Sequence, residues 1–159
     1  MISEQVWNEA ILKRSYDIEF DWFGIDKNGI LAIFSTFGRG YTPELVKKSR
    51  FDYIKVASEI ENLPFICKAN LITKSEGRFD DWLEYSQQGI IAFDYQDVHR
   101  NEKTGNYDLI SKPEELITVE QIGLKSSLIN KIPKFNLNFD VESSIAEIDL
   151  KINFVQHRV

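Results

Sequence analysis

The segment from Glu19 to Phe37 constrains the fold more than any other part of the chain, because it has the pattern of a β-hairpin. Its centre, Asp26-Lys27-Asn28-Gly29, is a turn, since Asn-Gly adopts the positive φ values that tight hairpin connections need. β-branched and aromatic residues flank the turn on both sides, as expected for two paired strands. A β-sheet therefore begins close to the N-terminus.

Acidic and apolar residues alternate before the turn. The apolar positions are Ile18, Phe20 and Trp22, and the acidic positions are Asp17, Glu19 and Asp21. On a strand, alternate residues share a face and lie roughly 7 Å apart. The three carboxylates therefore form a stripe, which suits a divalent cation, a basic partner or a solvated outer face.

The remaining pattern predicts further helices and strands. Helices are expected over residues 3–13, 43–62 and 79–88 and within 114–130, and strands over 90–98 and 107–110, while 64–73 is either a strand or irregular. Strict alternation in 135–141 and 147–154 predicts a closing hairpin. We therefore expect a single α+β domain spanning residues 1–159, with an antiparallel or mixed sheet, hairpins at both ends and helices packed on the sheet.

Composition excludes several classes of protein. With 43 % hydrophobic residues, the 159-residue chain is long enough to bury a core. Cys67 is the only cysteine, so it has no disulfide partner within the chain, and two histidines favour neither a metal site nor a cofactor. No segment has the roughly 20 apolar residues of a membrane span, and the N-terminus lacks a signal-peptide pattern. We expect a cytoplasmic protein.

The negative charge is unevenly distributed. Residues 1–79 carry 11 basic and 11 acidic residues, whereas residues 80–159 carry 8 basic and 14 acidic ones, which accounts for the net charge of −6. The stretch from Phe79 to His99 contains no Lys or Arg. Such a surface disfavours nucleic acid as a partner, because phosphates attract the opposite charge.

This acidic stretch is the leading candidate for an interface. Its carboxylates are Asp80, Asp81 and Glu84 on the predicted helix and Asp94 and Asp97 on the strand that follows, with Tyr85 and Tyr95 as candidate aromatic anchors. Carboxylates speed the approach of a basic protein, and aromatic side chains anchor it. The alternative is an ordinary acidic surface.

A second candidate site lies after the hairpin. Gly38-Arg39-Gly40-Tyr41 precedes a Thr-Pro helix start, an arrangement that exposes backbone N–H groups to an anion. It lacks the spacing of a P-loop or a dinucleotide-binding loop, so a simple strand-to-helix connection remains the alternative. Ser35 and Thr36 have no nucleophile motif around them, and we find no complete catalytic motif.

Residues 16–45 resemble the N-terminal signature of small bacterial immunity proteins from polymorphic toxin systems, including contact-dependent inhibition and type VI secretion. The matching residues are Asp21-Trp22-Phe23, Asp26, Gly29, Ala32, Phe34, Ser35, Thr36, Gly38, Gly40 and Pro43. The resemblance implies a small, acidic, non-enzymatic protein that binds a cognate toxin and covers its active site. A basic toxin such as a nuclease would suit the acidic second half.

Three functions follow from these observations. The first is an immunity protein that neutralises a cognate toxin in competition between bacteria, through the acidic residues named above. The second is a small-molecule-binding domain or enzyme, with a cleft formed by Arg39, Tyr41 and the stripe of Asp17, Glu19 and Asp21. The third is an accessory subunit that self-associates, since the sequence leaves the oligomeric state open.

Overall fold

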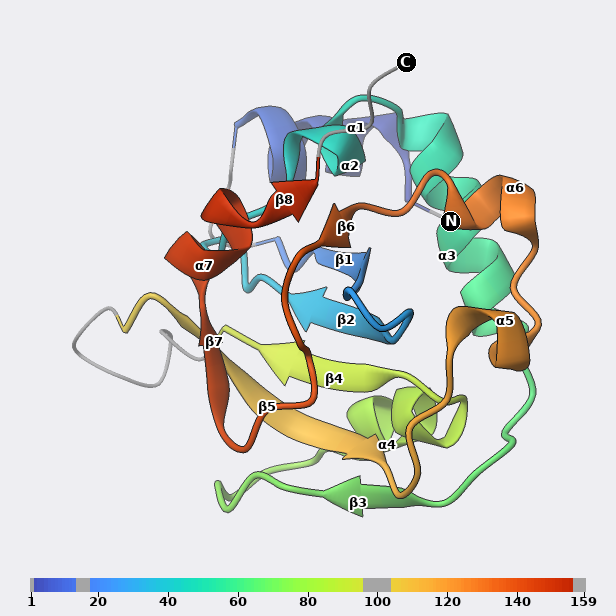
Figure 1. The fold of residues 1–159 in the computed structure, drawn as a ribbon. Coiled ribbons are helices and arrows are strands. Elements are labelled where there is room, and N and C mark those ends of the chain that lie inside the picture. Colours follow the sequence, from blue (N-terminus) through green and yellow to red (C-terminus); the bar gives the residue numbers. More distant parts are fainter. Residues whose placement is uncertain (1, 14–17, 96–103, 156–159) are drawn as a thin grey trace.

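The computed structural model describes residues 2–13, 18–95 and 104–155, and these form an α+β fold with helices packed on a mixed sheet (Figure 1). The strands are β1 (Asp21–Ile25), β2 (Leu31–Ser35), β3 (Ala69–Leu71), β4 (Ile91–Asp94), β5 (Asn106–Pro113), β6 (Lys134–Phe135), β7 (Ser144–Ala146) and β8 (Phe154–Val155). Within these residues the sheet order is β3-β5-β4-β2-β1-β6-β8, with β7 paired to β5. The predicted fold class is confirmed.

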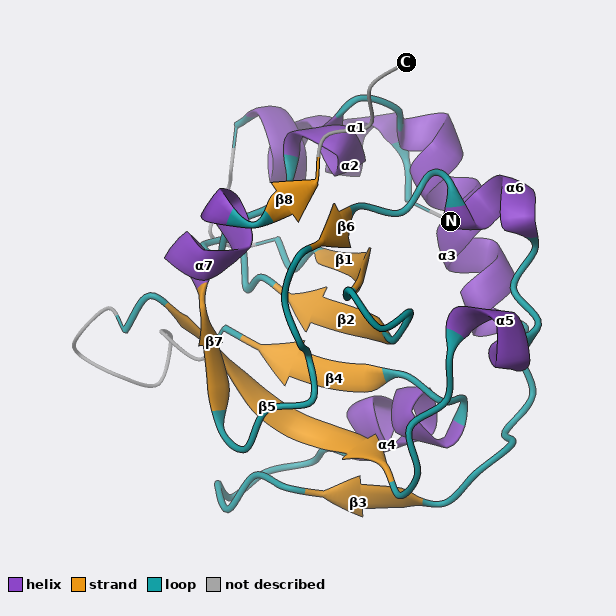
Figure 2. Ribbon diagram, in the orientation of Figure 1, coloured by secondary structure: helices purple, strands orange, loops and turns teal. Residues whose placement is uncertain are grey.

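The helices lie on both sides of the sheet and around its edges (Figure 2). They are α1 (Glu4–Trp7), the π-helical turn η1 (Asn8–Leu12), α2 (Glu44–Lys47), α3 (Arg50–Glu61), α4 (Asp80–Gln87), α5 (Val119–Ile122), α6 (Ser126–Ile129) and α7 (Glu147–Ile152). Among the described residues, none of these helices is both long and apolar enough to cross a membrane.

The predicted N-terminal hairpin is confirmed. β1 and β2 pair antiparallel, and the turn is fixed by Asp26, whose Oδ1 accepts hydrogen bonds from the backbone N–H groups of Asn28 (2.8 Å) and Ile30 (2.9 Å). Gly29 has φ +80°, as the turn requires. β1 itself differs from the prediction, because Trp22 and Phe23 are buried on opposite faces and the strand has no exposed acidic side.

Each face of the sheet has its own apolar core. One core gathers aromatic side chains, including Trp22, Phe34 and Phe139, and the other gathers aliphatic ones, including Ile33 and Ile60. In Figure 1 the chain between β6 and β7 crosses the aromatic face, while α4 lies on the opposite side. The cavity described below lies on the second face, where Ile33 is among its lining residues.

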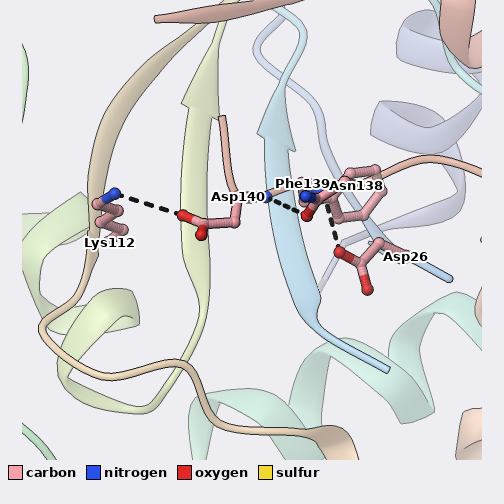
Figure 3. A network of polar contacts seen from close by, with 5 residues as sticks. All are labelled: Asp26, Lys112, Asn138, Phe139 and Asp140. Carbon is pink, nitrogen blue, oxygen red and sulfur yellow. Dashed lines mark hydrogen bonds and ion pairs between the residues drawn. The ribbon is translucent and has the colours of Figure 1, made fainter. Parts of the chain in front are cut away.

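A polar network connects the segment between β6 and β7 to the hairpin turn (Figure 3). Asp26 Oδ2 accepts a hydrogen bond from the Phe139 backbone N–H (2.9 Å). On the same segment, Asn138 Oδ1 accepts from the Asp140 N–H (3.0 Å), and Asp140 forms an ion pair with Lys112 (3.3 Å) on β5. Asp26 is 4 % exposed, so its carboxylate serves as a buried junction between two distant parts of the chain.

Two predicted elements differ from the structure. Of the predicted closing hairpin, the antiparallel pairing of β6 with β8 at Phe135 and Phe154 is present, but β7 and α7 lie between these two strands in the chain, and residues 147–152 form α7 and not a strand. The helix expected over 43–62 is divided into α2 and α3, because the Ser49 side chain accepts a hydrogen bond from the Asp52 N–H and starts a new helix there.

Candidate functional site: an acidic pocket beside α4

A cavity of about 500 Å³ opens between α4, the end of α3 and the face of the sheet where β1 begins and β2 ends. We call it the acidic pocket, and it is defined by its lining residues: Glu19, Asp21, Ile33, Ser35, Glu61, Leu63, Pro64, Phe65, Asp81, Trp82, Glu84, Tyr85 and Gln88. Five of these are carboxylates and three are aromatic, and the described part of the chain contributes no Lys, Arg or His to the lining.

The floor of the pocket is set by strand register. Asp21 on β1 lies opposite Ser35 on β2, and Ser35 lies opposite Asp94 on β4, so the three side chains share one face of the sheet. Ser35 Oγ donates a hydrogen bond to Asp21 Oδ1 (2.7 Å). The floor is therefore polar at this end of an otherwise apolar face.

The walls are held together by Gln87 and Gln88, at the C-terminal end of α4. Gln88 Nε2 donates hydrogen bonds to the carbonyl oxygens of Ile60 (3.0 Å) and Leu63 (2.9 Å), at the end of α3. The Gln87 carbonyl accepts from the N–H groups of Ile66 (2.8 Å) and Cys67 (3.2 Å). These contacts fix the distance between α4 and the 61–65 segment, and so the width of the pocket.

Burial and mutual repulsion raise the pKa values of the acids on the floor. The pKa of Asp21 rises to about 6, chiefly because of burial, although the Ser35 hydrogen bond opposes the change and Glu19 and Asp81 add to it. The pKa of Asp94 rises to about 7, again chiefly through burial, with further contributions from Glu19, Asp21 and Asp108. A hydrogen bond from the Tyr95 backbone opposes the change at Asp94, so both shifts reflect burial first and repulsion between neighbouring carboxylates second.

The same carboxylates also affect the aromatic wall of the pocket, which is formed by Trp82 and Tyr85. Burial, followed by the repulsion of Asp21 and the carboxylates around it, raises the pKa of Tyr85 to about 12. Trp82 stands one helical turn before Ser86 and contacts the Phe79 ring (5.8 Å between ring centres), while Tyr85 contacts the Phe23 ring (6.3 Å). Both rings are half-buried and line the cavity.

The pocket combines residues from both candidate sites predicted from the sequence. Asp81, Glu84 and Tyr85 come from the proposed interface, and Glu19 and Asp21 come from the acidic stripe before the turn. Asp80 is exposed on the first turn of α4 and is not part of the lining. Asp17 and Asp97 lie outside the residues that the structure describes.

Two expectations about exposure are wrong. Tyr95 is 0 % exposed because it belongs to the aromatic core on the opposite face of the sheet, so it does not serve as a surface anchor. Asp94 is only 9 % exposed; it lies beside Ser35 on β4 and is not among the residues that line the pocket. A strand buried on both faces carries no outward side, which the alternating pattern did not reveal.

The loop that carries Arg39 and Tyr41, near which a second cleft was predicted, is separate from the acidic pocket. Neither residue lines the acidic pocket, and the Tyr41 carbonyl accepts hydrogen bonds from Trp22 Nε1 (3.0 Å) and Tyr107 Oη (2.8 Å). A Cβ atom at Gly40 would collide with the Tyr107 side chain. This loop therefore packs tightly on the aromatic core.

Reasoning from sequence alone missed other residues of the site. Glu61 is the last residue of α3, Phe65 follows that helix, and Trp82 lies on α4; none of the three was among the predicted site residues. The contact between the end of α3 and α4 depends on Gln88, and nothing in the local pattern marks that residue.

The structure offers little for metal or thiolate chemistry. Within the described ranges, no three His, Cys, Asp or Glu side chains are placed to hold a metal ion. Burial raises the pKa of Cys67, whose thiol donates to the Ser86 carbonyl (3.2 Å). Comparisons with protein-family models, with curated proteins and with solved structures found no match to this chain.

Proposed function

We propose that this protein is a non-enzymatic inhibitor that binds a basic protein through the acidic pocket and the face of α4 beside it. The partner class is a bacterial toxin domain, for which a nuclease with a cationic phosphate-binding cleft is the leading example. The resemblance of residues 16–45 to immunity proteins supports this class.

One observation supports the proposal most strongly. Five described acidic residues outside the pocket form ion pairs, among them Asp52 with Lys131 and Asp140 with Lys112. In contrast, none of the five pocket carboxylates has a Lys or Arg partner among the described residues. Unpaired carboxylates that converge on a cavity are arranged to meet positive charge brought by another molecule.

Phe65 gives the same surface an apolar contact. Its side chain is 61 % exposed and lies at the rim of the pocket, next to Ile66, which is 44 % exposed. Interfaces commonly combine an aromatic anchor with a charged surround. The rim therefore has the composition of a protein-binding surface.

Co-expression tests the proposal directly. The chain is expressed with the C-terminal domain of a large secreted protein encoded immediately upstream, and growth and co-purification are measured. We expect growth to be rescued and a 1:1 complex to be recovered. Continued toxicity without a complex would reject the proposed function.

A second candidate is a protein that binds a small cationic molecule. The volume of the pocket, about 500 Å³, lies within the range of about 300–1,000 Å³ that is common for ligand sites. Convergent polar groups in such a cavity favour this candidate over a flat docking surface.

A further inference from the structure

The acidic pocket is deep enough to enclose one side chain of a partner. Its floor is formed by Ile33 and Ser35 on β2, and its walls by α4 and by the segment that follows α3. Gln88 holds the two walls at a fixed separation through its hydrogen bonds to Ile60 and Leu63. An occupant therefore enters a preformed cavity.

The charges that face an occupant come from separate elements. Glu19 and Asp21 stand on the β1 side, Glu61 at the end of α3, and Asp81 and Glu84 on α4. Because these carboxylates surround the cavity, a cation within it contacts several of them at once, and their mutual repulsion is relieved.

Asp94 provides an independent observation beneath the same site. The side chain is 9 % exposed, lies beside Ser35 on the face that forms the floor, and its Oδ1 is buried without a hydrogen-bond donor among the described residues. A buried carboxylate oxygen without a donor is costly. A cation above Ser35 would compensate for it, and no cationic side chain in the lining does so.

The aromatic wall favours a flat cation. Trp82 and Tyr85 present half-buried rings to the cavity, and Phe65 adds an exposed ring at its rim. Aromatic faces attract cations, and a guanidinium group also stacks on them. These rings therefore suit a group that is both planar and positively charged.

The distribution of carboxylates separates arginine from lysine. A guanidinium group has five N–H donors spread over a plane, whereas an ammonium group is a compact, strongly hydrated point charge. Carboxylate acceptors from three separate elements are better matched by the planar group, which also loses less hydration on burial.

We propose that the acidic pocket receives an arginine side chain of the protein partner. That this arginine belongs to a protein rests on the proposed function. The guanidinium group lies between the α4 rings and the carboxylates of the floor and walls.

The test uses probes that contain no partner protein. N-acetyl-arginine amide, its neutral citrulline analogue, N-acetyl-lysine amide and spermidine are titrated into the full chain, and the Trp82 indole N–H resonance is followed by NMR. We expect the arginine probe to bind, the lysine probe to bind several-fold more weakly, and the citrulline probe not to bind. Binding should weaken as salt is added.

Matched variants locate the site. Glu61→Gln together with Glu84→Gln removes two exposed pocket charges, and Glu114→Gln together with Glu115→Gln removes two exposed charges outside the lining. We expect the pocket variant to lose about tenfold or more in affinity for the arginine probe, and the control variant to change less than about twofold. Thermal unfolding checks that both variants are folded.

Several results would overturn the assignment. Equal binding of citrulline, equal or tighter binding of lysine, or an unaffected pocket variant would each reject it. An affinity for spermidine about tenfold above that for arginine would point instead to a free polyamine. If the arginine probe binds but no partner is recovered by co-expression, the pocket stands and the proposed function fails. If a partner binds but the probe does not, the pocket assignment fails.

Discussion

At the scale of single residues, Asp21 and Asp94 are the most unusual groups in the molecule. They flank Ser35 across three strands, and burial together with neighbouring carboxylates raises the pKa of Asp21 to about 6 and that of Asp94 to about 7. In an unfolded chain both would ionise near pH 4. Between about pH 4 and about pH 7 the folded state therefore holds protons that the unfolded state has released, so folding becomes less favourable as the pH rises.

The first prediction concerns this pH dependence. Because the pKa of Asp94 is raised to about 7, the free energy of unfolding should fall by on the order of 4 kcal/mol as the pH rises from about 4 to about 7. Asp94→Asn removes the titration, and we expect it to stabilise the protein by on the order of 2 kcal/mol at pH 8 and by little at pH 4.5. Urea unfolding at both pH values measures the difference. An equal effect at both, or the same gain from Asp140→Asn on the surface, would contradict it.

The second prediction concerns the buried junction in Figure 3. Asp26→Asn leaves an amide N–H group facing the Phe139 or the Ile30 N–H, because both carboxylate oxygens accept hydrogen bonds. We expect a loss of about 1–3 kcal/mol in the free energy of unfolding. Asp140→Asn, which breaks only the surface pair with Lys112, should cost less than about 1 kcal/mol. Similar losses in both variants, measured by urea unfolding, would show that Asp26 is not a special junction.

At the scale of elements, the hairpin was predictable because its turn chemistry is local. Asp26, Asn28 and Gly29 fix the turn whatever the rest of the chain does. The helix in the 147–154 segment was not predictable, because its alternating Ile148, Leu150 and Ile152 suit a strand. In α7 only Leu150 is buried, and both isoleucines are exposed. Long-range packing on the sheet, which alternation does not report, selected the helix.

The third prediction tests why α2 and α3 are separate helices. Ser49 Oγ accepts a hydrogen bond from the Asp52 N–H (3.1 Å) and caps α3. Ser49→Ala should lower the free energy of unfolding by about 1 kcal/mol, because the N–H group loses its partner. Ser58→Ala, at an exposed position inside the same helix, should be neutral or slightly stabilising. Thermal unfolding of the two variants gives the comparison, and equal changes would contradict the assigned cap.

At the scale of the whole molecule, the sequence predicted the negative charge of the candidate binding surface but not its shape. The excess of acids after residue 80 is visible in the composition. The pocket, however, joins Asp21, Glu61 and Glu84, which are far apart in the sequence and meet only through sheet register and the Gln88 bridge. Charge is additive along a chain, whereas a cavity depends on the packing of distant elements.

The last prediction follows from the charge of this surface. Asp80, Asp81 and Glu84 are exposed on α4, so they act on a basic partner before contact is made, and their effect is on the association rate. With the toxin recovered by co-expression, replacing the three by Ser should slow association about tenfold at low salt and flatten its salt dependence. As a control, we replace the exposed residues Glu114, Glu115 and Glu142 by Ser. This removes the same charge elsewhere and should leave the association rate within about twofold of the wild type.

Stopped-flow mixing across a range of salt concentrations distinguishes steering from contact. Near 1 M salt the screening length falls to about 3 Å, so the association rates of the wild type and the α4 variant should converge. A rate difference that persists at high salt would mean that the α4 acids act through direct contacts instead of through their field. A rate unchanged at low salt would show that the partner docks elsewhere, and a rate lowered equally by the control variant would show that only the net charge matters.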